Sequence, residues 1–127
     1  MSQLKSLLEK AQSNRVAVGQ FNISDWILLR AIFAAAQELR VPVIVRTSEG
    51  ERAFLGVTQV AALVSSLREE YVFPIFLNAD HTHSLDSAIS AANVPEYRCI
   101  SSTTTTRRSR PKKGVSCGLI SMYSSIE

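Results

Sequence analysis

Pro-Ile-Phe-Leu-Asn-Ala-Asp-His-Thr-His-Ser, residues 74–84, is the stretch that decides the fold. It begins with a short apolar run, which predicts a buried strand, and passes into an acid and two histidines followed by hydroxyls. Such a change is typical of a strand that ends at a functional edge, because a rigid strand holds the side chains at its end better than a free loop does. Asp80 and His81 are therefore candidate site residues.

The composition is that of one globular domain, with 127 residues, 46% of them hydrophobic and 20% charged. The charge is uneven, because residues 1–92 are nearly balanced and the net +3 comes from residues 93–127. Cys99 and Cys117 lack Cys-x-x-Cys spacing, which disfavours a zinc knuckle or a disulfide framework and favours a reduced, cytoplasmic setting. No signal-like N-terminus or long apolar stretch predicts secretion or a membrane span.

Strands and helices are predicted to alternate along residues 1–92. Periodicity, caps and prolines predict a first helix from about residue 4, strands over 16–21, 43–46 and 75–79, helices over 26–39, 60–71 and 84–92, and a polar loop over 47–50. The strand at 43–46 begins with three consecutive β-branched residues, as in a strand covered on both faces. This order predicts an α/β fold with parallel strands joined by right-handed crossovers.

Parallel strands end at one edge of a sheet, so Asn22, Ser48, Asp80 and His81 are expected to meet there. Neighbouring strand residues face opposite sides, so Asp80 and His81 can both reach the site only if the strand has already ended. No Gly-x-Gly-x-x-Gly or Gly-Lys-Ser/Thr motif is present, which disfavours nucleotide binding. Periodicity alone leaves a barrel and an open doubly wound sheet as alternatives.

Three motifs in register carry a family resemblance: Ala-Val-Gly-Gln-Phe-Asn at 17–22, Pro-Val-Ile-Val at 42–45 with Ser-Glu-Gly at 48–50, and Asn-Ala-Asp-His-Thr at 78–82. Residues 1–92 thereby resemble the N-terminal third of class II, zinc-dependent fructose-bisphosphate and tagatose-bisphosphate aldolases. The resemblance implies the first three β-α units of a TIM (β/α)8 barrel. It also implies a homo-oligomeric lyase that reversibly cleaves a ketose bisphosphate to dihydroxyacetone phosphate and an aldehyde. Thr82 stands where most relatives have Gly.

The resemblance also implies a role for each candidate residue. His81 matches one of three histidine ligands of the zinc, and Asp80 matches the acid that handles the proton at the aldehyde oxygen. Ser48 and Asn22 match positions that line the substrate pocket. Zinc in such a site stabilises the enediolate left by bond cleavage, and a positioned carboxylate contributes roughly 10²–10⁴ in rate by proton transfer.

Each of these residues also has a purely structural interpretation. His81 could be a hydrogen-bonded histidine at a strand end, Asp80 a cap of the following helix, and Ser48 a turn former. His83 departs from the family's ligand set, so we expect a solvated loop histidine there.

Residues 93–127 are rich in Ser and Thr, show neither helical nor strand periodicity and predict a disordered or poorly packed tail. The abrupt change suggests a gene that is truncated and shifted in frame near Asn93, and hence an inactive fragment with an incomplete zinc ligand set. The alternative is a non-enzymatic protein whose basic run, residues 107–113, binds nucleic acid without sequence preference. That run contains no aromatic residue, and no nucleic-acid-binding fold surrounds it.

Overall fold

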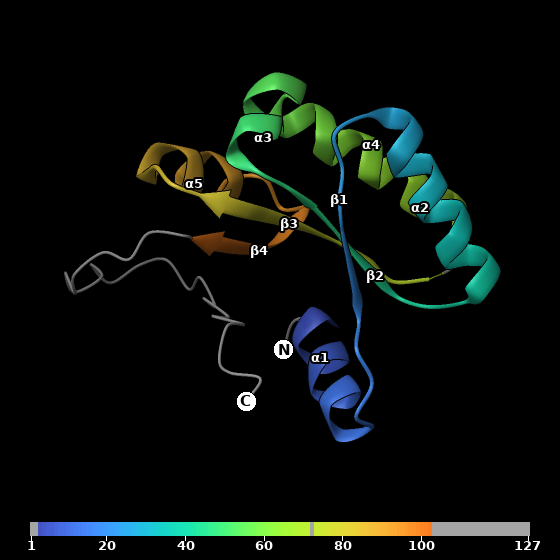
Figure 1. Ribbon diagram of the computed structural model, residues 1–127. Coiled ribbons are helices and arrows are strands. Elements are labelled where there is room, and N and C mark those ends of the chain that lie inside the picture. Colours follow the sequence, from blue (N-terminus) through green and yellow to red (C-terminus); the bar gives the residue numbers. More distant parts are fainter. Residues whose placement is uncertain (1–2, 72, 103–127) are drawn as a thin grey trace.

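The structure, a computed structural model, describes residues 3–71 and 73–102. A single parallel sheet has the strand order β1-β2-β3-β4, so each strand pairs with the next one in the sequence (Figure 1). The elements are α1 (Gln3–Ser13), β1 (Gly19–Asn22), α2 (Trp26–Leu39), β2 (Val43–Thr47), α3 (Glu49–Leu55), α4 (Val57–Glu70), β3 (Ile75–Thr82), α5 (Leu85–Ala92) and β4 (Tyr97–Ser102).

The two faces of the sheet are covered by different helices. On the outer face, Val45 and Leu77 belong to the main core together with Phe33 of α2 and Val64 of α4. On the inner face, a smaller cluster joins residues of β2 and β3 to Leu4 of α1, which lies on the opposite side of the sheet from α2 and α4 (Figure 1). The expectation that β2 is covered on both faces is confirmed, since four of its five residues are buried.

The inner face changes from apolar to polar along the strands. Ile44 and Phe76 pack near α1 at the start of the strands. Two residues further along, Arg46 and Asn78 occupy the same face, and Asp80 follows on β3. Polar side chains therefore collect where the strands end, as the alternation of strands and helices predicts.

Helix α2 has the predicted bounds, and local chemistry sets both of its ends. The Asp25 carboxylate accepts a hydrogen bond from the Leu28 amide at 2.8 Å, which satisfies one of the amides at the helix N-terminus. Arg40 adopts a left-handed conformation with φ 55° and closes the last turn, and Pro42 prevents continuation. β2 can therefore begin directly after the helix.

The prediction of a polar loop over residues 47–50 is wrong, because helix α3 begins at Glu49. Ser48 caps this helix: its hydroxyl accepts from the Glu51 amide at 3.3 Å, and the Glu51 carboxylate accepts from the Ser48 amide at 2.7 Å. This reciprocal arrangement is a capping box, and it stabilises a helix in a segment too short to show periodicity. The strand-to-helix connection at the end of β2 is consequently tight.

The expectation of no strand after Ala92 is also wrong, because β4 pairs with β3 over residues 97–102. Two β-bulges interrupt this pairing. Tyr97 pairs with Leu77 and Cys99 with Asn78, so Arg98 is an extra residue. Because a bulge breaks the period-two alternation, the strand leaves no regular pattern in the sequence.

The remaining predictions for the tail concern residues outside the described part of the chain. They include Cys117 and the basic run of residues 107–113. Within residues 3–71 and 73–102, no helix is long and apolar enough to cross a bilayer.

Candidate active site

Asp80 and His81 lie in the second bulge, at the end of β3. Ala79 pairs with Ile100 and Thr82 with Ser102, so both residues oppose Ser101. His81 has a φ of 46°, in the left-handed region that non-glycine residues seldom adopt. As a result, the His81 Nε2 atom lies 3.5 Å from Asp80 Oδ2. The bulge removes the conflict with strand alternation and brings both side chains to the same side.

Arg46 of β2 holds the Asp80 carboxylate. Its Nη1 atom donates to Asp80 Oδ2 at 2.6 Å, and the Asp80 side chain is almost fully buried. Arg46 gives no signal in the sequence, because a lone arginine ending an apolar strand resembles an ordinary surface charge. The register of the sheet reveals its role, since Arg46 lies beside Asn78, two residues before Asp80 on the same face.

Arg52 of α3 is buried, with 1% of its surface exposed, and it joins three segments of the site. Its Nη1 atom donates to the carbonyl oxygens of Thr47 and Asp80, the latter at 3.0 Å. Its Nη2 atom donates to the hydroxyls of Thr82 at 2.8 Å and Ser87 at 3.5 Å. Burial lowers the pKa of this guanidinium below its usual value. Arg52 thus fixes the ends of β2 and β3 and the first turn of α5 relative to one another.

Asn22 and Ser48 meet through Glu51. The Asn22 amide donates to Glu51 Oε1 from the end of β1, and the Ser48 hydroxyl donates to Glu51 Oε2 at 2.9 Å. The expected convergence of Asn22 and Ser48 at the rim is therefore present, with Glu51 as a connecting residue that sequence reasoning missed. The Ser-x-x-Glu spacing of a capping box is a signal that could have revealed it.

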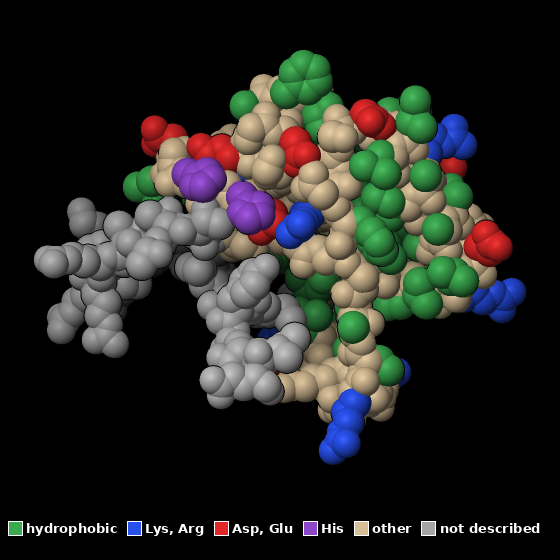
Figure 2. Space-filling model, viewed as in Figure 1, with side chains coloured by type: hydrophobic (Ala, Val, Ile, Leu, Met, Phe, Trp, Pro, Cys, Tyr) green, Lys and Arg blue, Asp and Glu red, His purple; other side chains and the backbone are tan. Residues whose placement is uncertain are grey.

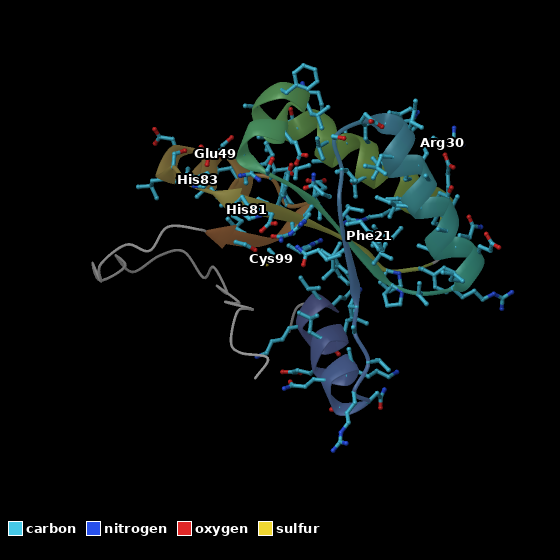
Figure 3. The ribbon with its side chains drawn as sticks, viewed as in Figure 1. Phe21, Arg30, Glu49, His81, His83 and Cys99 are labelled. Carbon is cyan, nitrogen blue, oxygen red and sulfur yellow. The ribbon has the colours of Figure 1, made fainter. Side chains whose placement is uncertain are left out.

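His83 lies beyond the end of β3, beside Glu49 (Figure 3). The Glu49 carboxylate accepts from the backbone amides of His83 at 2.5 Å and Ser84 at 3.1 Å. These bonds, the His83 one foremost, lower the pKa of Glu49 because they favour the charged carboxylate. Ser84 caps α5 by accepting from the Ser87 amide at 3.2 Å. Glu49 thereby secures the turn that follows Asp80 and His81.

The polar side chains of the rim provide fewer metal ligands than a complete zinc centre needs. The His81 side chain is 54% exposed and can offer one imidazole nitrogen. A catalytic zinc needs about three protein ligands, and no cluster of three His, Cys, Asp or Glu side chains suited to a metal occurs among residues 3–71 and 73–102. The described residues therefore do not by themselves provide the ligands of a catalytic zinc.

Parallel strands paired in sequence order, with outer helices and a polar rim at the strand ends, have the arrangement of a sector of an α/β barrel. The sequence model for class II fructose-bisphosphate aldolase matches residues 2–104, and the chain belongs to this family. It is 36% identical over 91 residues to a probable fructose-bisphosphate aldolase of Bacillus subtilis. The matched region covers 69% of this chain and 32% of that protein. The chain thus spans about a third of that relative's length.

Solved structures show the same fold. The YdjI aldolase of Escherichia coli K12 matches with a TM-score of 0.70 and 18% identity, over 79% of this chain and 39% of that one. The fructose-bisphosphate aldolase of Campylobacter jejuni matches with a TM-score of 0.72 and 20% identity, over 78% and 36%. A putative fructose-1,6-bisphosphate aldolase of Coccidioides immitis matches with a TM-score of 0.70 and 20% identity, over 77% of this chain and 34% of that one.

Proposed function

We propose that the chain forms the N-terminal sector of a zinc-dependent aldolase that cleaves fructose 1,6-bisphosphate or a related ketose bisphosphate to dihydroxyacetone phosphate and an aldehyde. In this proposal His81 is a zinc ligand and Asp80 handles the proton at the aldehyde oxygen. The observation that carries it is the contact between Asp80 and His81, which lie side by side in a bulge at the end of a parallel strand. Active sites of barrel enzymes lie at that end of the strands.

Asp80 is suited to proton transfer by the way it is held. Arg46 donates a hydrogen bond to one carboxylate oxygen, and Arg52 donates one to the Asp80 backbone carbonyl. Rotation of the carboxylate is therefore restricted. A positioned acid–base group gains its effect from being within hydrogen-bond reach of the reacting oxygen. We infer that the two arginines position the carboxylate, and that Asp80 gives and takes the proton.

Asn22 and Ser48 are proposed to contact the substrate. Both side chains are hydrogen-bonded to Glu51, and the two residues lie at the ends of β1 and β2. A fixed amide and a fixed hydroxyl can hydrogen-bond a polyhydroxylated substrate with little loss of side-chain entropy. The cap formed by Ser48 is compatible with this role, because a hydroxyl oxygen has two lone pairs.

We further propose that the 127-residue chain alone has little or no aldolase activity. One histidine at the rim leaves the metal site incomplete within the described residues. We also propose that the protein works in the cytoplasm, where it would meet sugar-phosphate substrates.

Two assays test the proposal. In the first, the purified chain with added zinc is incubated with fructose 1,6-bisphosphate, and we expect no cleavage above background; cleavage at the rate of a complete class II aldolase would contradict the predicted inactivity. In the second, residues 1–102 replace the matching third of a complete class II aldolase. We expect this chimaera to be active, and Asp80→Asn to lower its kcat by roughly 10²–10⁴ without loss of zinc. An unchanged kcat would remove Asp80 from the mechanism.

A further inference from the structure

A cleft lies at the opposite end of β3 from Asp80 and His81. Its volume is about 590 Å³. It opens beside Pro74 and Ile75, where β3 begins, and Asp80 lies five positions further along the strand, a distance of about 17 Å. The cleft is lined by Leu7, Tyr71, Phe73, Phe76, Arg68 and Arg98, among others. It combines an apolar wall with two guanidinium groups.

Arg68 is fixed in this cleft by its own hydrogen bond. It lies in the last turn of α4, and its Nε atom donates to the Ile75 carbonyl at 2.7 Å. No other hydrogen bond to Arg68 occurs in the part of the chain that the structure describes, so its two terminal nitrogens remain available. A guanidinium held at Nε, with both Nη groups available, is arranged for bidentate binding of an anion.

Arg98 reaches the same cleft from β4 because of the first bulge. It is the extra residue between the Leu77–Tyr97 and Asn78–Cys99 pairs. Bulges redirect side chains and are frequent near binding sites. Here the bulged residue brings a second positive charge to a cleft that already holds Arg68.

The two arginines are not neutralised by close carboxylates. Across residues 3–71 and 73–102, no ion pair within 4.0 Å joins either guanidinium to Asp or Glu. Burial lowers the pKa of Arg68, the charge of Arg98 lowers it further, and the charge of Glu96 opposes both effects. Two cations that repel each other in a partly desolvated cleft gain stability when an anion lies between them.

A structural explanation accounts for only one of these residues. A basic side chain in the last turn of α4 stabilises the negative end of the helix dipole, and this would justify Arg68 alone. It does not explain why β4 adds Arg98 to the same cleft.

We propose that this cleft binds a phosphate monoester with an apolar or aromatic body. A phosphate dianion matches the two positive charges, and its oxygens match the geometry of paired guanidinium groups. The apolar body would lie against Leu7, Phe73 and Phe76. The volume is within the range of small-molecule sites. The site is separate from the rim that carries Asp80 and His81.

Titration of the full 127-residue chain with phenyl phosphate, followed by calorimetry, tests the proposal. We expect saturable one-to-one binding, weaker binding of inorganic phosphate, and no binding of neutral benzyl alcohol. Arg98→Gln should raise the Kd at least about tenfold, because it removes one charge-assisted contact, and Arg98→Lys should restore part of the affinity. The matched control is Arg30→Gln, at an exposed position on α2, which should leave the Kd unchanged.

A second variant separates this cleft from the rim. His81→Ala should leave phenyl phosphate binding unchanged, since the rim lies at the other end of β3. Equal affinity of Arg98→Gln and the unaltered chain would overturn the proposal, as would loss of binding in His81→Ala with retention in Arg98→Gln. Thermal melts of each variant identify any effect that comes from unfolding.

Discussion

The rim at the ends of β2 and β3 and the outer edge of β1 differ in how completely they are covered. At the rim, Arg52 joins β2, β3 and α5, and the Asp80 side chain is buried against Arg46. At the β1 edge, a cleft of about 770 Å³ is lined mainly by apolar side chains, and Phe21 remains 46% exposed. Hydrophobic side chains also gather on the surface around α2 (Figure 2), where Ile27 is 79% exposed.

This difference shows which parts of the fold have all their packing partners within a few β-α units. Every contact that builds the rim is made between neighbouring units, so the four strands and the helices between them suffice to organise it. Covering β1 needs another strand and helix, which none of the described residues provide. In a closed barrel the last strand lies beside the first, and β1 is the edge where that strand would pair.

The largest effect is expected at Arg52. Arg52→Met removes the donors for two backbone carbonyls and the Thr82 hydroxyl while keeping much of the side-chain volume. Each buried acceptor left unsatisfied costs about 1–3 kcal/mol, so the free energy of unfolding should fall by roughly 3 kcal/mol or more. Urea titration measures this, with Arg30→Met on the exposed face of α2 as the control, expected within about 0.5 kcal/mol. Equal losses in the two variants would show that Arg52 does not hold the rim together.

Paired truncations compare the two regions directly. Leu77→Ala, in the core behind the rim, should lower the free energy of unfolding by about 2–5 kcal/mol, because Leu77 is fully buried. Phe21→Ala at the β1 edge removes a larger side chain, yet we expect less than about 1.5 kcal/mol, because roughly half of Phe21 is already in water. Urea denaturation of both variants gives the comparison. A larger loss for Phe21→Ala would mean that the β1 edge is covered in solution.

Ser48→Ala should have a smaller effect. The substitution removes the cap of α3 and one contact of Glu51, and it should lower the free energy of unfolding by about 1 kcal/mol, within a range of roughly 0.5–2. Ser66→Ala, at an exposed position inside α4, is the matched control and should be neutral. If both serine variants unfold at the same urea concentration, the capping box is not formed.

The smallest effect concerns the dependence of stability on pH. Because the folded-state pKa of Glu49 is below its ordinary value of 4.5, its contribution is present above that pH and is lost as pH falls through the lowered pKa. Glu49→Gln should therefore flatten the part of the stability curve below about pH 4.5. Urea midpoints across this range measure the change, and Glu70→Gln at the exposed end of α4 serves as control. A curve for Glu49→Gln that keeps the original slope would exclude this contribution.

Much of this arrangement could be predicted from the sequence, and the exceptions have physical causes. Caps and prolines located α2 and α5, and the apolar runs located β2 and β3. β4 was missed because its bulge erases the alternation on which strand prediction depends. α3 was missed because a seven-residue helix shows little periodicity, although its Ser-x-x-Glu capping box was visible.

For the candidate site, too, part of the arrangement could be predicted from the sequence and part could not. The order of strands and helices was enough to place Asn22, Ser48, Asp80 and His81 at one rim. It could not reveal that His81 adopts a left-handed conformation, since that depends on the pairing of β3 with β4. Nor could it identify Arg52, because a charged residue in a polar stretch is usually solvated and its burial follows from tertiary packing.

Metal analysis of the chimaera carrying residues 1–102 tests most directly whether the bulge at the end of β3 delivers a zinc ligand. The measurement is bound zinc per protein together with the rate of fructose 1,6-bisphosphate cleavage, for His81→Ala and for His83→Ala. We predict that His81→Ala loses both metal and activity, whereas His83→Ala keeps both. Full zinc content and activity in His81→Ala would contradict the account.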